Sequence, residues 1–492
     1  MVRQLTTRAQ VNGYRFLLRR LEHALVRRDV RLLHDPMRAQ MRALAIGTVL
    51  TMVALAGFGI WGLIRPQGSV GDAHILVSKD SGGLYVLVDD VVHPVLNLAS
   101  ARLITGTDER PRSVADSRLA GYPRGPLLGI PGAPVGIAPS AHPGTSTWTV
   151  CDRVTGRQSV ESVVIADHAH PGASIRGAGR DEALFVTDGA EDFLIYLIER
   201  GDGLVPVRAE VDTDSVAVLR AFGLEDHTPR PVTAGLLNTF PEVDELTPPD
   251  IPGAGRTVDL VPGGARVGSV VKTSGIDGAA SYHVLLADGV QQVGEPTAEL
   301  LRLADPASTP EVISVPPALV AAIPRTNTLP VDDFPAHLPR PLAVSSTPVV
   351  CSIWARADGD TRARPGLLVG QRLPLPEGAR PVALTSADGA GPGLDGVYVR
   401  PGSGEYVQTT GAEPDSSRAE SLFYVSDSGV RFGIPDTATG RMLGRGDRPR
   451  PAPWPVLALL PAGPTLSRGS ALVAHDGIGP DGDGAAIAVP GN

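Results

Sequence analysis

Residues 43–64 read A-L-A-I-G-T-V-L-T-M-V-A-L-A-G-F-G-I-W-G-L-I, a run without a charged side chain. As an α-helix this run would be about 33 Å long, enough to cross a hydrocarbon layer roughly 30 Å thick. Trp61 lies near its end, where aromatic side chains favour the membrane interface. A cleaved signal peptide has a shorter apolar segment that begins earlier, and a buried soluble helix is the plainer alternative. The run therefore predicts a transmembrane helix.

The charges on the two sides of this run differ in sign. Residues 1–42 carry ten arginines and three acidic side chains, whereas the rest of the chain carries 34 basic and 50 acidic side chains. Because positively charged flanks stay on the cytoplasmic side, we expect a single-pass protein of the inner cell membrane with a cytoplasmic N-terminus. The domain after residue 64 would then be extracytoplasmic, that is, periplasmic.

The N-terminal segment, residues 1–42, is predicted to be a basic amphipathic helix. Apolar side chains recur at helical spacing and arginines occupy the other faces, whereas Pro36 is expected to end or kink the helix. Such a helix could dock on a partner, lie on anionic lipid or present a solvated basic face, and the apolar stripe favours the partner. The predicted docking residues are Tyr14, Leu17, Leu21, Leu25, Arg19, Arg20, Arg27 and Arg28, and Leu18 and Leu32 continue the stripe.

The transmembrane run carries small residues on one side. Ala43, Gly47 and Thr51 follow each other at intervals of four residues. This small-xxx-small spacing lets two helices approach closely within a membrane. We therefore predict that these three residues pack against neighbouring membrane spans.

The remainder of the chain contains an internal repeat. Residues 232–252 follow the pattern V-x-x-x-L-x-x-x-F-P-x-x-x-x-L-x-x-x-x-I-P, and residues 315–335 match it position by position, with Ile and Phe at two of the apolar places. A shorter pair, P-R-G-P-L-L at 123–128 and P-A-G-P-T-L at 461–466, flanks them. Alternating Val, Leu and Tyr with Asp-Gly turns predicts a pair of strands before each element. These strand-like stretches are residues 84–95, 195–207, 282–293 and 423–434.

Short helical runs such as residues 297–303 follow the predicted strands. We infer four units of strand, turn, strand and short helix, in which the first resembles the fourth and the second resembles the third. A solenoid would place similar neighbours in series. This order instead favours a mainly-β (α+β) domain with four repeats around a central core and a pseudo-twofold arrangement. The predicted segments are a linker at 65–74, repeats at 75–135, 185–255, 256–340 and 396–475, core parts at 136–184 and 341–395, and a flexible tail at 476–492.

The chain has two cysteines, and their places agree with this symmetry. Cys151 lies in W-T-V-C-D between the first two repeats, and Cys351 lies in V-V-C-S-I-W between the last two. In an oxidising compartment two cysteines in equivalent places are expected to pair. A bond between them would close a loop of about 200 residues and stabilise the fold by roughly 5 kcal/mol. The alternative is two unrelated buried thiols.

The sequence offers no catalytic motif. The nearest approach to a P-loop, residues 268–273, lacks the glycine before Lys272. Residues 391–396 match G-x-G-x-x-G but run into a predicted strand, whereas a dinucleotide site needs a helix there. Aromatic residues make up 4% of the chain, too few for a base-stacking surface, so no nucleic-acid partner is expected. We predict no catalytic residue and no cofactor.

Two further stretches contain residue types that bind metals. His168 and His170 could bind a metal from one strand, but the sequence gives no third ligand nearby, so surface histidines are the better interpretation. Residues 476–484 contain several Asp and Gly residues but lack the glutamate that completes a calcium loop. We therefore predict no metal site.

Four stretches of this chain resemble one protein family. They are R-A-Q-V-N-G-Y-R-F-L-L-R-R-L-E-H-A-L-V-R-R-D-V at 8–30, with H-D-P at 34–36, H-P-V-L-N-L-A-S-A-R at 93–102, P-R-G-P-L-L-G-I-P at 123–131 and L-L-N-T-F-P at 236–241. In these stretches the chain resembles EccB, a component of the actinobacterial type VII (ESX) secretion machine. The resemblance spans nearly the whole chain, and none of the matching stretches is catalytic.

The resemblance implies a structural subunit that assembles and stabilises an export channel for WXG100-type proteins. It implies an outer domain with a central core, four repeats similar to cell-wall-binding modules of phage lysins, and a disulfide for which Cys151 and Cys351 are the candidates. The implied partners are the FtsK-like ATPase EccC, the multi-spanning EccD, EccE and the mycosin protease. The outer domains of the family also associate with one another.

Two alternative functions accompany this resemblance. Some EccB proteins are described as ATPases, which would make ATP a cofactor by family description alone. The sequence has no nucleotide motif, and ATP is scarce outside the cytoplasm, so we favour the structural role. A cell-wall anchor is the other alternative, because of the repeats.

Overall fold

The computed structural model describes residues 7–28, 36–64, 70–156, 159–201, 203–261, 264–276, 278–304, 312–389 and 391–479. The chain divides into two compact units, residues 1–71 and residues 72–492. The second unit is called the β domain. Leu32, half of the predicted linker and most of the predicted tail lie outside the described residues.

Within residues 7–28 and 36–64, the first unit contains two helices, α1 (Arg8–Arg27) and α2 (Pro36–Ile64). The α1 helix begins with a capping contact, in which the Thr7 backbone N–H donates to the Gln10 side chain over 3.0 Å. It ends at Arg28, whose φ of 57° is left-handed. The prediction that Pro36 ends this helix was wrong, because Pro36 is instead the first residue of α2. Proline suits that position, since the first helical N–H needs no partner within the helix.

The α2 helix contains the candidate membrane span. Residues 40–61 have a mean hydropathy of 2.1, and none of this stretch is buried within the protein. The two threonines of the span donate their hydroxyls back to the helix, Thr48 to the Leu44 carbonyl and Thr51 to the Gly47 carbonyl. Their polar groups are therefore satisfied without water, as an apolar environment requires.

The β domain contains four repeats with the same order of elements, three strands, a helix, a fourth strand and a short helix. Repeat 1 has β1 (Ile75–Ser78), β2 (Leu84–Val88), β3 (Val91–Pro94), α3 (Leu98–Thr105), β4 (Arg112–Val114) and α4 (Asp116–Leu119). Repeat 2 has β9 (Glu182–Thr187), β10 (Asp192–Arg200), β11 (Gly203–Glu210), α5 (Val216–Ala221), β12 (Arg230–Pro231) and α6 (Ala234–Leu237).

The third and fourth repeats follow the same order. Repeat 3 has β15 (Val270–Ser274), β16 (Ala280–Leu285), β17 (Val290–Val293), α7 (Glu295–Ala304), β18 (Ile313–Ser314) and α8 (Pro317–Ala321). Repeat 4 has β24 (Gly404–Thr410), β25 (Leu422–Ser426), β26 (Arg431–Ile434), α9 (Thr437–Met442), β27 (Arg450–Pro453) and α10 (Trp454–Leu457).

Each repeat forms its own sheet with one topology. The first three strands pair antiparallel, and the fourth strand pairs parallel to the first, as in the order β3-β2-β1-β4 of repeat 1. The four strand-like stretches predicted from the sequence correspond to the second and third strands of each sheet. The four repeats are confirmed, and each one contains a first strand, a fourth strand and a second short helix that the predicted unit of strand, turn, strand and short helix lacks.

The prolines of the repeated sequence motif close each repeat. After the second short helix, the carbonyls of Pro123, Pro241, Pro324 and Pro461 each accept a backbone hydrogen bond of 2.8–2.9 Å from the third strand of the same repeat. The residue two places after each proline donates back to the same strand. The motif is therefore a structural bridge that holds the short helix against the sheet edge.

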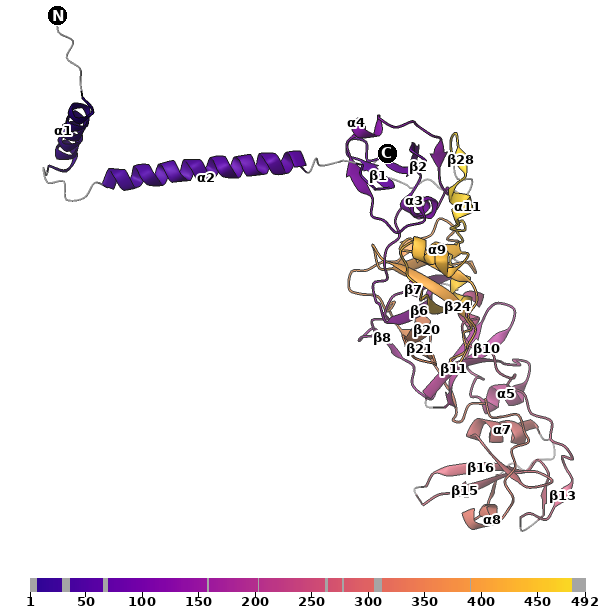
Figure 1. The fold of residues 1–492 in the computed structure, drawn as a ribbon. Helices are drawn as coiled ribbons and strands as arrows, with labels where there is room; N and C mark the ends of the chain where they lie inside the picture. Colours follow the sequence, from indigo (N-terminus) through magenta and orange to yellow (C-terminus); the bar gives the residue numbers. More distant parts are fainter. Residues whose placement is uncertain are drawn as a thin grey trace, which may run out of the picture. The chain divides into compact units, whose positions relative to one another are not determined.

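A seven-stranded sheet lies between the repeats. Its order is β22-β23-β7-β6-β20-β21-β8, and β6 and β20 lie side by side at its centre (Figure 1). The strands are β6 (Thr145–Thr155), β7 (Ser159–Ala166), β8 (Ile175–Gly177), β20 (Val349–Ala357), β21 (Arg364–Gly370), β22 (Val382–Ala383) and β23 (Gly396–Val399). The short strands β5 (Leu127–Leu128), β13 (Thr257–Val258), β14 (Ala265–Arg266), β19 (Arg340–Pro341) and β28 (Ala474–His475) and the helix α11 (Arg468–Ala471) complete the described elements.

The apolar clusters show which repeats pack together. Repeats 1 and 4 share one cluster, in which Ile75 and Leu103 lie with Tyr424. Repeats 2 and 3 share another, in which Phe222 lies with Phe334. Repeats 2 and 4 both cover one face of the central sheet, and the cysteines belong to the other face. The pseudo-twofold arrangement predicted from the sequence is therefore built from the pairs 1 with 4 and 2 with 3.

Gly289 provides a test of the proline bridge in repeat 3. A Cβ atom at this position would lie 2.3 Å from the Pro324 carbonyl oxygen, which is backbone and cannot turn aside. We expect Gly289→Ala to destabilise the β domain by about 2 kcal/mol, the usual cost of overpacking. At Gly203 a Cβ atom would meet nothing within 4 Å, so Gly203→Ala is the matched control. Urea unfolding should give a lower free energy of unfolding for Gly289→Ala than for Gly203→Ala. Equal stabilities of the two variants would contradict this role of the bridge.

Candidate functional site

The predicted docking residues of α1 all lie on the surface. The apolar side chains are exposed, Tyr14 by 66%, Leu17 by 58%, Leu21 by 62% and Leu25 by 75%. Arg19, Arg20, Arg27 and Arg28 are exposed as well. At 100° per residue the apolar side chains form one face, and most of the arginines lie on the opposite side. The helix therefore presents an uncovered apolar stripe beside a basic face, which we call the α1 stripe (Tyr14, Leu17, Leu18, Leu21 and Leu25).

The small residues of α2 share one face of the candidate span. Ala43, Gly47 and Thr51 are exposed, and a Cβ atom at Gly47 would meet nothing within 4 Å. The same face continues at helical spacing through Ala54, Phe58 and Trp61, and these are exposed too. The side chains on this face are thus small near the start of the span and bulky near its end.

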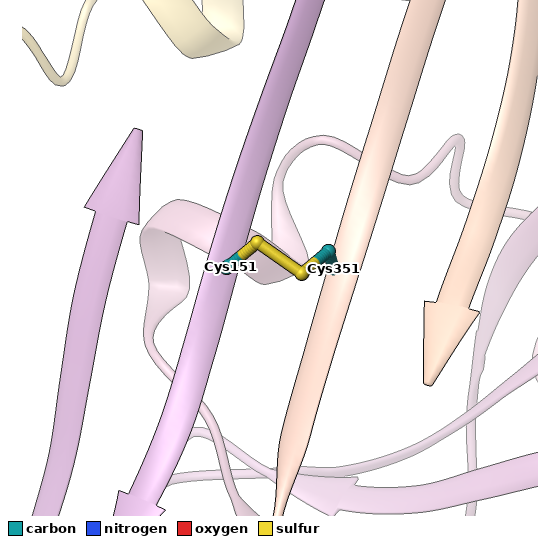
Figure 2. The surroundings of a disulfide bond; sticks show 2 residues. All are labelled: Cys151 and Cys351. Carbon is teal, nitrogen blue, oxygen red and sulfur yellow. A yellow bond between two sulfur atoms is a disulfide. The ribbon is translucent and has the colours of Figure 1, made fainter. Parts of the chain in front are cut away.

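Cys151 and Cys351 form a disulfide at the centre of the seven-stranded sheet (Figure 2). They are directly opposite residues on β6 and β20, with Cα atoms 4.0 Å apart, and neither residue has any exposed surface. The predicted pairing is confirmed. The bond joins two strands that come from opposite halves of the chain, so it holds the halves together at their shared sheet.

A buried carboxylate, that of Asp152, follows Cys151 on β6 and ties the central sheet to repeat 2. Asp152 accepts a hydrogen bond from the Thr233 backbone N–H over 2.6 Å and another from the Thr233 hydroxyl over 3.1 Å. The Thr233 hydroxyl in turn accepts from the Leu236 N–H at the start of α6. Burial raises the pKa of Asp152 to about 6, although the bonds from Thr233 and the charge of Arg230 act in the other direction.

The raised pKa of Asp152 predicts a pH-dependent stability. The folded pKa of about 6 lies above the ordinary value of 3.8, so between these values the folded protein binds more protons than the unfolded chain. The contribution of Asp152 to stability therefore grows as the pH falls from 7 to 4, by at most about 3 kcal/mol. Asp152→Asn should remove this gain. Urea unfolding of the wild-type protein and of Asp152→Asn at pH 7 and pH 5 measures this gain. An equal change in the free energy of unfolding between the two pH values in both proteins would contradict the assignment.

The stretches that approach nucleotide motifs take other structures. Lys272 lies within β15, a strand paired on both sides, and its ammonium sits 5.7 Å from the centre of the Tyr282 ring. The glycines at 391–396 form a loop that leads into β23, and the Asp388 carboxylate accepts the Gly393 N–H. Neither stretch places backbone N–H groups at the start of a helix, which phosphate binding at such motifs requires.

The two histidines singled out in the sequence make different contacts in the structure. His168 lies beside His142, with ring centroids 4.0 Å apart, whereas the His170 backbone N–H donates to the Pro374 carbonyl. Within the described ranges no group of three or more His, Cys, Asp or Glu side chains could hold a metal ion. Sequence reasoning missed His142 and the contact of Asp152 with Thr233, because both arise from chain segments far apart in the sequence.

Together these features define a class of protein. One candidate membrane helix carries a β domain of four repeats pinned by a central disulfide, and its candidate functional surfaces are exposed helix faces. The chain belongs to the EccB family of type VII secretion proteins. Residues 3–480 match the family described as "Type VII secretion system ESX-1, transport TM domain B".

A curated relative supports the same family. The ESX-3 secretion system ATPase EccB3 of Mycolicibacterium smegmatis is 38% identical over 491 residues, covering 97% of this chain and 92% of the relative.

Solved structures are similar over most of the chain. A chain of an intact ESX-5 inner membrane complex has a TM-score of 0.74 at 34% identity and covers 99% of both chains. A chain of the periplasmic assembly from the ESX-5 inner membrane complex has a TM-score of 0.71 at 35% identity, covering 85% of this chain and 100% of that one. The EccB3 dimer from the ESX-3 core complex has a TM-score of 0.70 at 36% identity, covering 82% of this chain and 100% of that one.

Proposed function

We propose that this chain is a structural subunit of a type VII (ESX) secretion membrane complex, in which it assembles and stabilises the export channel. The observation that carries the proposal is the match along the whole chain to a subunit of an intact inner membrane complex. The exposed helix faces and the disulfide-linked β domain suit an assembly role, because each can act by contact with other subunits and none requires a bound substrate.

Each part of the chain takes one role in this proposal. The α1 stripe docks on cytoplasmic partners, and the small-residue face of α2 packs against neighbouring membrane spans. The N-terminus is cytoplasmic and the β domain periplasmic, because the arginines precede the span. The β domain, pinned through Cys151 and Cys351, meets copies of itself above the pore. The partners are EccC, EccD, EccE and the mycosin protease.

Deletion of the chain tests this role in its native membranes. Blue-native electrophoresis of mild-detergent extracts should show the FtsK-like ATPase and the multi-spanning subunit in one large particle when the chain is present. We expect the particle to disappear in the deletion strain and to return on complementation. A particle of unchanged size without the chain would contradict the assembly role.

The word ATPase in the name of the relative from M. smegmatis leads to a second test. The proposed role assigns no catalytic residue and no ATP to this chain. We expect the purified full-length protein to hydrolyse ATP no faster than a control preparation from cells that lack it. Hydrolysis that one point substitution abolishes without unfolding the protein would overturn the non-enzymatic role.

A further inference from the structure

Repeat 4 differs from the other repeats in the loop between its first and second strands, which covers residues 411–421. The loops at the same place in repeats 1, 2 and 3 are shorter and cover residues 79–83, 188–191 and 275–279. The long loop is fastened to the central sheet, because the Ala363 N–H beside β21 donates to the Pro414 carbonyl over 2.7 Å. Within the loop the Ser416 hydroxyl accepts from the Gly411 N–H over 3.0 Å. Extra loop length that is fixed in this way is typical of a binding site.

A hollow of about 510 Å³ lies beside the long loop. Its walls are the turn after β20, the long loop and the segment that leads into β27, which contribute residues 356–360, 416–419 and 447–451. Gln408 of β24 also lines it. The volume is within the range of sites that hold small ligands or short peptide segments. Because the walls come from segments far apart in the sequence, only the folded domain forms this hollow.

Four arginines and three aspartates line the hollow. They are Arg356, Arg418, Arg448, Arg450, Asp358, Asp360 and Asp447. Asp360 pairs with Arg364 over 3.3 Å. Asp447 pairs with Arg441 over 3.0 Å, and neither of these two partner arginines lines the hollow. Two of the three aspartates are therefore neutralised from outside.

Arg450 is the one lining arginine with a carboxylate partner among the described residues. It pairs with Glu405 of β24, and Asp358 is a second carboxylate near it. The other carboxylates of the long loop do not line the hollow; they are Glu413, Asp415 and Glu420.

The other three arginines have no carboxylate partner within the described part of the chain. Arg356 donates its Nε–H to the Asp360 backbone carbonyl over 2.9 Å. Arg418 and Arg448 are exposed, and their guanidinium groups make no hydrogen bond or ion pair with the described residues. The hollow thus has an excess of positive charge, although the chain after residue 42 carries 50 acidic and 34 basic side chains.

We propose that this hollow binds an acidic peptide segment of a partner protein. A guanidinium group can bind a carboxylate through two parallel hydrogen bonds. Because Arg356, Arg418 and Arg448 come from three different walls, they suit an extended segment with carboxylates at more than one position. Pro449 and Pro451 give the hollow apolar surface for the rest of the segment. The hollow is also several times larger than a phosphate ion, which favours a peptide over free phosphate.

The neighbouring sheet edge does not offer an alternative way to hold the peptide. The strand β27 is the edge strand of its sheet, but its sequence is R-P-A-P. Pro451 and Pro453 have no N–H to donate, so a peptide cannot pair with β27 as a regular added strand. Recognition therefore depends on the side chains of the hollow.

Photo-cross-linking of the full-length protein in detergent tests this site. The probe is a hexaglutamate peptide with a photoreactive group and a fluorescent label, used at about 0.15 M salt so that weak surface attraction is screened. We expect saturable binding and cross-links within residues 356–360, 416–419 and 447–451, located by mass spectrometry. Cross-links confined to the arginines of α1 would overturn the proposal. Inorganic phosphate that displaces the probe as well as unlabelled peptide does would also overturn it, because the hollow would then be a phosphate site.

A pair of double variants distinguishes the hollow from general attraction to positive charge. Arg418→Gln with Arg448→Gln should weaken binding of the probe about tenfold, because each exposed ion pair contributes a factor of up to about five. Arg110→Gln with Arg118→Gln removes two exposed arginines from repeat 1 and changes the net charge equally. This control should bind the probe as the wild-type protein does. Equal weakening in the two double variants would contradict a specific site.

Discussion

Replacing both Cys151 and Cys351 by serine is expected to lower the free energy of unfolding of the β domain by about 5 kcal/mol. The bond joins residues 200 positions apart, and a cross-link of this span removes much of the conformational freedom of the unfolded chain. The loss should be large compared with the few kcal/mol that a single core substitution costs. Urea unfolding of the purified full-length variant measures it.

Two controls distinguish the effect of losing the disulfide from the effect of replacing the cysteine side chains. The wild-type protein unfolded in the presence of reductant should resemble the double variant, because both lack the cross-link. The single variant Cys151→Ser leaves a buried thiol at Cys351 and should be no more stable than the double variant. A double variant as stable as the oxidised wild-type protein would show that the bond does not hold the two halves of the chain together.

Replacing Leu17, Leu21 and Leu25 together by serine is expected to reduce recovery of cytoplasmic partners at least tenfold. These side chains are more than half exposed, and burying three leucines against a partner would contribute several kcal/mol. Tenfold corresponds to only about 1.4 kcal/mol, so the estimate is conservative. The membrane helix is unchanged in this variant, so the amount of variant protein in the membrane should equal that of the wild-type protein.

The matched control for the α1 stripe is Phe16→Ser. Phe16 is 57% exposed but lies on the opposite face of α1, among the arginines. Affinity purification of tagged proteins from native membranes, with quantitative mass spectrometry, compares the variants. Equal loss of partners from both variants would contradict docking through the α1 stripe.

Much of this fold could be predicted from local sequence signals. The uncharged run at 43–64 predicted the span within α2, and the proline motifs predicted four repeats because each proline closes a similar bridge. The hairpins of the four sheets followed from alternating apolar residues and Asp-Gly turns. The segment boundaries proposed from the sequence stay predictions.

What the sequence did not predict depends on contacts between distant segments. The fourth strands of the repeats were missed because strands as short as Arg230–Pro231 carry no alternation of their own. First strands such as Glu182–Thr187 were missed because they are buried on both faces and so do not alternate either. Pro36 was interpreted as a helix stop, although proline suits the first turn of a helix equally well. The approach of His142 to Asp167 depends on how residues 138–145 lie against the end of β7, which neither residue type nor spacing reveals.

The central claim is that this chain acts as an assembly subunit, and isolation of the tagged full-length protein from its native membranes tests it most directly. The protein is extracted in mild detergent, sized as an intact particle and analysed by mass spectrometry. We predict one large particle that also contains an FtsK-like ATPase and a multi-spanning membrane protein. Recovery of the chain alone, as a monomer or a simple dimer, would contradict the assembly role.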